Sequence, residues 1–349
     1  MTRLRAVLVG TGGWARTHEA AYRRCREVEL VGICGHRNVD ALRSLAQEHG
    51  VTETALELGE LVARTQPDIV DVACNPHYRL EAVQAALLPC VRLINLEKPM
   101  ALTPADAYEI ERLCREHGKL LLVNHQKKFL PAWREAKEAI ASGSIGDLLF
   151  LRATCQGNLL EQGTHLVDMV LHFAGYRPVA WVMGQIDDLE GLGKESASAP
   201  DAAAATLAFA DGLRAYLTFG AAGHAVPGET NKWQHFAVEA YGTRGHVRVA
   251  LNRGLEVTLY GQGTATSSER GWDLYHVQAE AEHLDAAARY ARNPEIGHLS
   301  DLPRSLVSFQ VIMAIQASAC ERGRISLPRR FDDRLMAQLE ELRVEKAER

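Results

Sequence analysis

Short apolar runs alternate with amphipathic segments through the first 125 residues of the chain. The runs occupy 6–9, 30–34, 69–73, 91–96 and 120–123. Between them, apolar residues recur at helical spacing in 14–26, 39–49, 56–65, 78–88 and 105–117. Continuous apolar strands separated by helices are typical of a parallel sheet covered on both faces. Residues 1–125 are therefore predicted to form a doubly wound α/β domain.

The pattern changes after residue 125. Alternating strands are predicted at 148–154, 179–186, 204–209, 213–219, 235–241, 247–250 and 256–260, with helices at 132–141, 160–173, 277–292, 302–322 and 332–346. Turn signals at Asp211-Gly212 and at Thr243-Arg244-Gly245 favour hairpins. Residues 126–349 are therefore predicted to form an α+β domain with a largely antiparallel, open sheet. It would supply the substrate site, and the last helix could pack back on the first domain.

Composition narrows the class of protein. The 349 residues are 47% hydrophobic and carry a formal net charge of −5. Without a basic field, nucleic acid is not an expected partner. The first apolar strand is too short for a signal segment or a membrane span, so no membrane partner is expected. The seven cysteines contain no C-x-x-C pair, which favours free thiols and a cytoplasmic location.

A glycine-rich turn follows the first strand and opens the first helix. It comprises Gly10, Thr11, Gly12, Gly13, Trp14 and Ala15. Gly10 permits a tight turn, Gly12 lets the backbone approach a pyrophosphate, and the small Ala15 allows close packing of the helix on the strand. The free amides and the dipole of the helix N-terminus favour phosphate. In this strand–turn–helix setting, the pattern predicts a dinucleotide-binding Rossmann domain.

The end of the second strand bears on the choice between NAD and NADP. An acid that would hold the ribose 2′-hydroxyl is expected there, but the stretch from Cys34 to Asn38 contains none. Arg37, together with His36, can instead pair with a 2′-phosphate. We therefore predict NADP(H) as the preferred cofactor, with NAD(H) possible. The alternative is that Arg37 is solvated beside a cofactor of either form.

Two further segments carry candidate chemistry. Glu97-Lys98-Pro99 follows a parallel strand at its carboxyl end, where ligands of open α/β sheets bind. A lysine there can exchange a proton with a substrate oxygen. In the second domain, one face of a predicted helix carries polar residues: Glu161, His165, Asp168 and His172. That face could do acid–base work, bind a divalent metal or simply be solvated; nothing fixes a metal geometry, so no metal is predicted.

These features together resemble the glucose-fructose oxidoreductase, inositol dehydrogenase and rhizopine-catabolism (Gfo/Idh/MocA) family. The resemblance extends over almost the whole chain. Its motifs are the glycine turn, the stretch 68–76, the E-K-P tripeptide at 97–99, Pro131 with Gly143 and Gly146, the helix segment 161–168, and the hairpin 241–245.

The resemblance implies roles for particular residues. Lys98 and His165 would be the catalytic pair, with Glu161 where relatives often carry Asp. The stretch Cys74, Asn75, Pro76 and the Glu97–Lys98 pair would contact the cofactor. The open sheet would form a homodimer or homotetramer interface.

Two departures from the family pattern affect the substrate site. Glu161 is one methylene longer than Asp, which shifts any contact that its carboxylate makes. Only residues 155–158 separate the strand 148–154 from the helix at 160–173, a shorter connection than many relatives have. Candidates for binding substrate hydroxyls are Gln126, Lys128, Gln156 and Asn158, together with Lys98 and His165.

The resulting hypothesis is a reversible alcohol/carbonyl redox reaction on a sugar, inositol or related polyol. One alternative is a glycoside hydrolase or lyase that oxidises its sugar transiently with a tightly held nicotinamide. A second alternative is a regulator that binds NADP without catalysis.

Overall fold

The computed structural model describes residues 2–35, 37–187, 189, 199–267 and 271–347. The chain forms two compact units. Unit 1 comprises Met1–Phe129 and His276–Ser305, and unit 2 comprises Leu130–Tyr275 and Leu306–Arg349. Residues 276–305, which follow the predicted boundary at 125/126, thus lie in unit 1, and the last helix lies in unit 2.

Among the described residues, unit 1 contains a six-stranded parallel sheet in the order β3-β2-β1-β4-β5-β6. Its strands are β1 Leu4–Val9, β2 Val28–Cys34, β3 Glu53–Ala55, β4 Ile69–Val72, β5 Leu93–Glu97 and β6 Leu120–Asn124. The strand order reverses between β1 and β4, and open α/β sheets bind their ligands at such a point, at the carboxyl ends of the strands. The predicted doubly wound Rossmann fold is confirmed.

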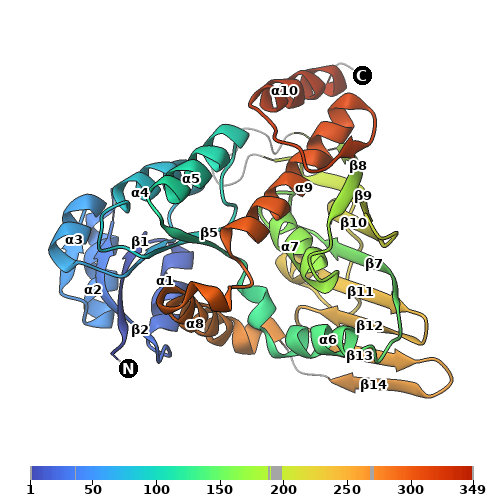
Figure 1. The fold of residues 1–349 in the computed structure, drawn as a ribbon, viewed down its shortest axis with the longest axis horizontal. Coiled ribbons are helices and arrows are strands. Elements are labelled where there is room, and N and C mark those ends of the chain that lie inside the picture. Colours follow the sequence, from blue (N-terminus) through green and yellow to red (C-terminus); the bar gives the residue numbers. More distant parts are fainter. Residues whose placement is uncertain (1, 36, 188, 190–198, 268–270, 348–349) are drawn as a thin grey trace. The chain divides into compact units, whose positions relative to one another are not determined.

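Helices cover both faces of this sheet (Figure 1). They are α1 Gly13–Tyr22, α2 Val39–His49, α3 Leu58–Thr65, α4 Arg79–Ala85, α5 Pro104–Glu116 and α8 Gly271–Arg292, with 3₁₀ turns η1 Pro76–Tyr78, η2 Gln126–Phe129 and η5 Pro294–Ile296. The Thr103 hydroxyl accepts a hydrogen bond from the Asp106 amide at the start of α5, and Pro104 is the first residue of this helix. α8 joins α1 on one face because its alanines and Leu284 pack into the apolar cluster that contains Leu4, Ala21 and Val28.

The described part of unit 2 contains a nine-stranded sheet in the order β14-β13-β12-β11-β7-β10-β9-β8-β15. Its strands are β7 Leu148–Cys155, β8 Val179–Asp187, β9 Ala202–Phe209, β10 Arg214–Gly220, β11 Phe236–Gly242, β12 Gly245–Ala250, β13 Gly254–Leu259, β14 Gly263–Ser267 and β15 Ile325–Ser326. Only β7 and β10 pair in parallel within this sheet as described, so the prediction of a largely antiparallel sheet is confirmed. The hairpin turns fall at Asp211–Gly212 and Thr243–Arg244, as predicted.

The helices of unit 2 are α6 Pro131–Ala141, α7 Gly163–Phe173, α9 Leu302–Glu321 and α10 Arg334–Ala347, with the 3₁₀ turn η4 Lys232–Gln234. α6, α7 and α9 pack on one face of the sheet (Figure 1). Trp133 on α6 joins them to the sheet, with its ring 6.0 Å from that of Phe173 on α7 and 5.4 Å from that of Phe236 on β11. Gly184 on β8 admits the backbone of α9, because an added Cβ would lie 2.8 Å from the Ile315 carbonyl oxygen.

None of the helices in the described ranges is both long enough and apolar enough to span a lipid bilayer.

Candidate active site

The glycine turn between β1 and α1 has a backbone shape suited to a pyrophosphate. Gly10 has φ +128°, and an added Cβ there would lie 2.6 Å from the carbonyl oxygen of Ala73. At Gly12 and Gly13, an added Cβ would meet no described atom within 4 Å. The N-terminus of α1 therefore opens onto free space, where its first amides and its dipole favour an anion. These residues fit the phosphates of a dinucleotide.

The segments that follow β2 and β4 approach each other at this edge of the sheet. The Arg37 guanidinium carbon lies 5.6 Å from the centre of the Tyr78 ring. Tyr78 ends the 3₁₀ turn that Pro76 begins, and the Asn75 side chain accepts a hydrogen bond from the His77 amide, which shapes this turn. A guanidinium above an aromatic ring is held electrostatically by the ring face. Tyr78 was not singled out from the sequence.

Two other predicted cofactor residues belong to the same edge. Cys74 is half-buried, and burial raises the pKa of its thiol, which favours the neutral form. His36, predicted as the companion of Arg37, lies outside the described residues.

Lys98 follows β5 directly, and its ammonium lies on the same side as the glycine turn. The Nζ atom is 5.7 Å from the centre of the Trp14 ring, which belongs to that turn. The Lys98 carbonyl accepts a hydrogen bond from Arg79 Nη2 at 3.0 Å, so the backbone here is tied to α4. The sheet edge thus brings together the predicted Lys98, the glycine turn and the segment after β4.

The Glu97 side chain is 3% exposed and lies inside unit 1. Its Oε1 accepts a hydrogen bond from Asn124 Nδ2 at 2.8 Å and lies 3.3 Å from His18 Nε2. Burial acts to raise the pKa of Glu97, but the His18 hydrogen bond and the charges of Lys98, His18 and Arg79 lower it overall. Glu97 is therefore an ionised, buried residue directly before Lys98 in the chain.

Unit 2 carries His165, Asp168 and His172 on α7. The interpretation of this stripe as a possibly solvated face is wrong, because every residue of α7 is buried. The helix is also shorter than predicted, since it begins at Gly163 and leaves Glu161 in the preceding turn. Asn158 shapes that turn: its Oδ1 accepts hydrogen bonds from the amides of Leu160 and Glu161 at 3.0 and 2.8 Å.

The remaining candidates for substrate binding make contacts within their own units. Gln126 and Lys128 lie in η2 of unit 1, and both are buried. Lys128 Nζ donates a hydrogen bond to the Leu299 carbonyl at 2.6 Å. Gln156 Nε2 in unit 2 donates to the Gly223 carbonyl at 3.4 Å. A role for these residues in binding substrate stays a prediction.

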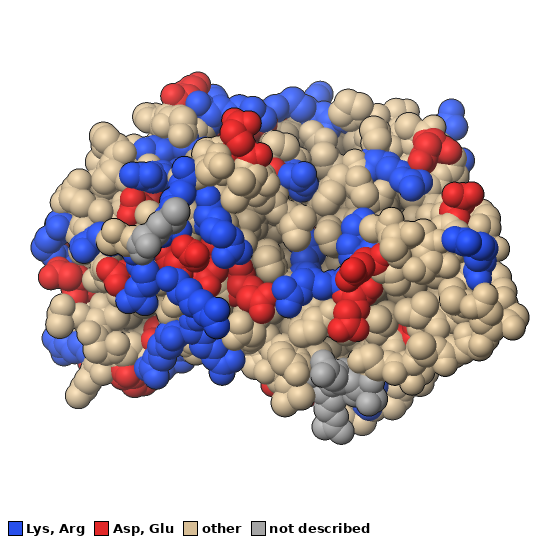
Figure 2. All heavy atoms as spheres, turned by 60° about the horizontal axis from the view of Figure 1, so that its bottom comes forward, with Lys and Arg blue, Asp and Glu red and all other residues tan. Residues whose placement is uncertain are grey.

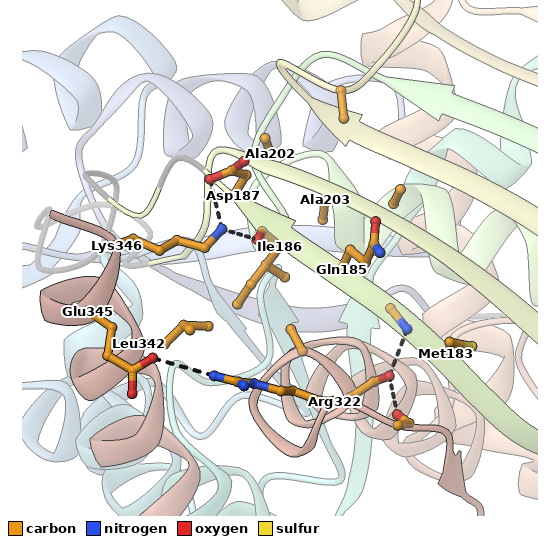
Figure 3. A pocket seen from close by; sticks show the side chains of 16 residues that line it. Met183, Gln185, Ile186, Asp187, Ala202, Ala203, Arg322, Leu342, Glu345 and Lys346 are labelled. Atoms are coloured by element: carbon orange, nitrogen blue, oxygen red, sulfur yellow. Dashed lines mark hydrogen bonds and ion pairs between the residues drawn. The ribbon is translucent and has the colours of Figure 1, made fainter. Parts of the chain in front are cut away.

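A cavity of about 600 Å³ lies in unit 2 between β8, β9 and the ends of α9 and α10 (Figure 3). Lys346 reaches from α10 to the Ile186 carbonyl and to Asp187, at 2.8 Å each. Arg322 lies 3.6 Å from Glu345. The charged side chains that line this cavity are therefore paired with one another. None of the predicted site residues lines the cavity. We do not assign the active site to this cavity.

Several polar residues near Lys98 were missed at the sequence level, among them His18 and Asn124. One signal was present, since Asp71 is a charged residue in β4, a strand whose residues are all buried. A buried carboxylate requires a partner. His18 Nδ1 provides it, at 2.9 Å from Asp71 Oδ2.

The described residues contain no group of three or more His, Cys, Asp or Glu side chains arranged to hold a metal ion.

Comparison with known proteins relates the first part of the chain to one family of oxidoreductases. Residues 4–125 match the sequence profile of the Gfo/Idh/MocA oxidoreductase family, described as having an NAD-binding Rossmann fold. The chain is 29% identical over 144 residues to a D-apiose dehydrogenase of Paraburkholderia graminis, which is 41% of this chain and 38% of that protein. It is 26% identical over 201 residues to a D-glucoside 3-dehydrogenase of Escherichia coli, which is 50% of this chain and 55% of that protein.

The fold likeness extends further than the sequence matches. A levoglucosan dehydrogenase solved in complex with NADH and levoglucosan superposes with a TM-score of 0.79 at 18% identity, covering 94% of this chain and all of that one. At this identity the likeness concerns the fold. The profile match, the two curated relatives and the shared two-sheet fold agree. Residues 4–125 are thus similar to the NAD-binding domain of the Gfo/Idh/MocA oxidoreductases.

Proposed function

We propose that the protein is an NAD(P)-dependent oxidoreductase that interconverts an alcohol and a carbonyl group on a sugar, inositol or related polyol. The observation that carries the proposal is the position of Lys98, whose ammonium lies beside Trp14 of the glycine turn. A proton-exchanging group there stands next to the site that fits a dinucleotide. The sugar dehydrogenases among its relatives support a polyol as the substrate class.

Lys98 and His165 are assigned complementary roles in this reaction. When bound, the nicotinamide ring supplies the acceptor or donor of hydride. Lys98 donates a hydrogen bond to the reacting oxygen and stabilises the negative charge that develops on it. His165 takes the hydroxyl proton during oxidation and returns it during reduction. Glu161, in the turn before α7, is assigned to orient the substrate or His165.

The cofactor is proposed to be NADP(H) in preference to NAD(H). The cation–π contact with Tyr78 holds the guanidinium of Arg37 beyond the end of β2, where the adenosine ribose binds in this fold. A guanidinium there pairs with a 2′-phosphate through charge-assisted hydrogen bonds.

The partners are proposed to be a small polyol and further copies of the same chain. Lys and Arg alternate with Asp and Glu over the face drawn in Figure 2, without a broad basic region in its described part, which suits a small substrate better than a polyanion. A homodimer or homotetramer would form through the sheet face of unit 2 opposite its helices. The cytoplasmic location stays a prediction from the cysteine pattern.

The test is a panel of sugars, inositols and keto-sugars, assayed with NADP(H) and NAD(H) for redox change of the nicotinamide. For any active substrate, Lys98→Ala and His165→Ala should each lower kcat by about 10²- to 10⁴-fold, the usual contribution of a general acid or base. Lys232→Ala removes an exposed lysine of unit 2 and should leave the rate unchanged.

Other outcomes would point elsewhere. Glycosidic cleavage without net change of the free cofactor would replace the proposal with the transient-redox hydrolase or lyase. Binding of NADP without turnover on the whole panel, with a biological output that survives Lys98→Ala, would replace it with the regulator.

A further inference from the structure

Three buried carboxylates from three different elements of unit 1 surround one buried imidazole. His18 on α1 lies 2.9 Å from Asp71 of β4, 3.3 Å from Glu97 of β5 and 3.7 Å from Glu280 of α8. All four side chains are at most 4% exposed. We call these four residues the buried acid cluster.

The buried acid cluster has more negative than positive charge when all its members are ionised. Its only cation among the four is His18, and burial of uncompensated charge is costly. Asn124 Nδ2 donates to Glu97 Oε1 and to Glu280 Oε2, at 2.8 Å each, so one neutral amide bridges two acids. Glu280 Oε1 accepts no hydrogen bond from any described residue. Protonation of one acid relieves the imbalance.

Glu280 is the member best placed to hold that proton. Burial raises the pKa of Glu280 to about 7, and the charges of Asp71 and Glu97 act in the same direction against that of His18. Burial opposes charge on His18 as well, but the carboxylates around it raise its pKa well above the ordinary value. Its Nε2 also lies 3.1 Å from Asn124 Nδ2.

The other polar groups packed around the cluster are bound to it or to its neighbours. Tyr22 of α1 donates to Asp71 at 3.0 Å, and burial keeps it neutral by raising its pKa well above the ordinary value. Asn95 of β5 donates to Asp71 at 2.8 Å and meets His283 of α8 at 2.9 Å. Burial lowers the pKa of His283 well below its ordinary value, so this second imidazole is neutral. The charges of Lys98 and Arg79 also act on Glu97 and lower its pKa.

Attachment of α8 does not require these charges. Ala281, Leu284 and Ala288 already pack into the apolar cluster against β1 and α1. Replacing buried ionic groups by apolar ones is often neutral or stabilising, so an ionic cluster is not needed to attach α8.

The position of the buried acid cluster is distinctive, because it includes Glu97, the residue directly before Lys98. Glu97 is the last residue of β5, so holding its side chain inside fixes the strand end from which Lys98 continues.

We propose that the buried acid cluster positions Lys98. Ionisation of Glu280 changes its hydrogen bond with Asn124, and Asn124 also binds Glu97. The charge on Glu280 therefore changes the position of the strand end that carries Lys98. Glu280 and His18 are thus positioning residues. The inference rests on the proposed function for the catalytic meaning of Lys98. Both measurements below use the protein without substrate, so they can be interpreted even if the substrate panel fails.

The first measurement is the free energy of unfolding in urea between pH 5 and 8. Because the pKa of Glu280 is raised by folding from 4.5 to about 7, the folded state holds a proton that the unfolded chain releases in this interval. The resulting stabilisation is full below the unfolded value and is lost as the pH rises through the folded value. The wild type should lose stability more steeply toward pH 7 than Glu280→Gln. Glu282→Gln, the same change outside the cluster on the same helix, should follow the wild type.

The second measurement is the rate at which an N-hydroxysuccinimide acetate acylates Lys98, followed by mass spectrometry of its peptide from pH 6 to 9. The wild type and Glu282→Gln should show an added inflection near pH 7 that Glu280→Gln lacks. In the wild type, the added inflection should change the acylation rate of Lys98 by roughly tenfold between its low-pH and high-pH sides. This is the change expected for two sites coupled by about one pKa unit. Glu280→Asp keeps an acid on a shorter side chain and should retain an inflection at a displaced pH.

Three results would overturn the inference. Identical pH dependence of unfolding in the wild type and Glu280→Gln would show that Glu280 does not hold the proton. A changed unfolding curve with unchanged Lys98 acylation would show that the cluster is structural only. If Glu280→Gln does not fold, equal inflections in the wild type and Glu280→Asp would overturn it as well.

Discussion

At the residue scale, the proposed preference for NADP(H) depends on one guanidinium beyond the end of β2. Arg37 is held by the ring of Tyr78, and no acid stands between Cys34 and Asn38 to repel a phosphate. A preformed cation loses less conformational freedom on binding than a free one does. Discrimination should therefore depend on Arg37 itself.

We expect Arg37→Ala to lower kcat/KM for NADP by roughly 10- to 100-fold while changing that for NAD little, because a hydrogen bond to a charged group contributes about 1.5–3 kcal/mol. Steady-state kinetics with both cofactors measure this. Arg43→Ala removes an exposed arginine of α2 and is the control. A preference for NAD that persists in Arg37→Ala would contradict the assignment.

At the element scale, the turn between β1 and α1 depends on Gly10. Its positive φ and the close approach of the Ala73 carbonyl leave no room for a side chain. The same close approach aligns the loop after β4 with the start of α1. The packing of two loops at one sheet edge thus depends on the missing Cβ of one glycine.

Gly10→Ala should destabilise the protein by about 2–4 kcal/mol, the sum of a strained backbone and a steric clash. It should also abolish binding of the dinucleotide. Urea unfolding and titration with NADPH measure the two effects. Gly59→Ala on α3 is the matched control: its added Cβ meets no described atom within 4 Å, and it should stabilise by up to about 1 kcal/mol. Equal stability of the two variants would contradict the role of Gly10.

At the scale of the whole molecule, the sheet face of unit 2 opposite its helices carries a row of aromatic rings. Phe150 stacks on Tyr241 at 4.4 Å and meets Tyr216 at 6.2 Å, and the row continues to His246 and Tyr260. Tyr216 is 49% exposed. Exposed aromatic residues gathered on a sheet are typical of interfaces, which supports the proposed association of like chains.

Tyr216→Glu should therefore weaken self-association, raising its dissociation constant by roughly 30-fold or more, since a central aromatic contact contributes about 2 kcal/mol or more. Sedimentation velocity over a range of concentrations measures this. Leu56→Glu changes a similarly exposed apolar residue of unit 1 and should have no effect. A monomeric wild type, or a Tyr216→Glu variant that associates unchanged, would exclude this face as the interface.

Local patterns along the chain were sufficient for much of the fold. Apolar runs and helical periodicity predicted the parallel sheet of unit 1, and alternation with turn residues predicted the antiparallel sheet of unit 2, because strand and helix periods depend on neighbouring residues. The glycine turn and Lys98 at the end of a strand were found in the same way. The short strands β3 and β14 were missed because they bury few apolar side chains.

The tertiary structure decided what depends on residues far apart in the sequence. The burial of α7 could not be inferred from its polar stripe, since the elements that cover it come from elsewhere in the chain. The turn before α7 is shaped by the side chain of Asn158, which accepts hydrogen bonds from the amides of Leu160 and Glu161. The buried acid cluster joins residues 18, 71, 97 and 280, and only folding brings their charges together. The sequence therefore determined the elements and the lysine at the sheet edge, whereas tertiary packing decided the charge around that lysine, because electrostatic energy depends on distance and burial in space.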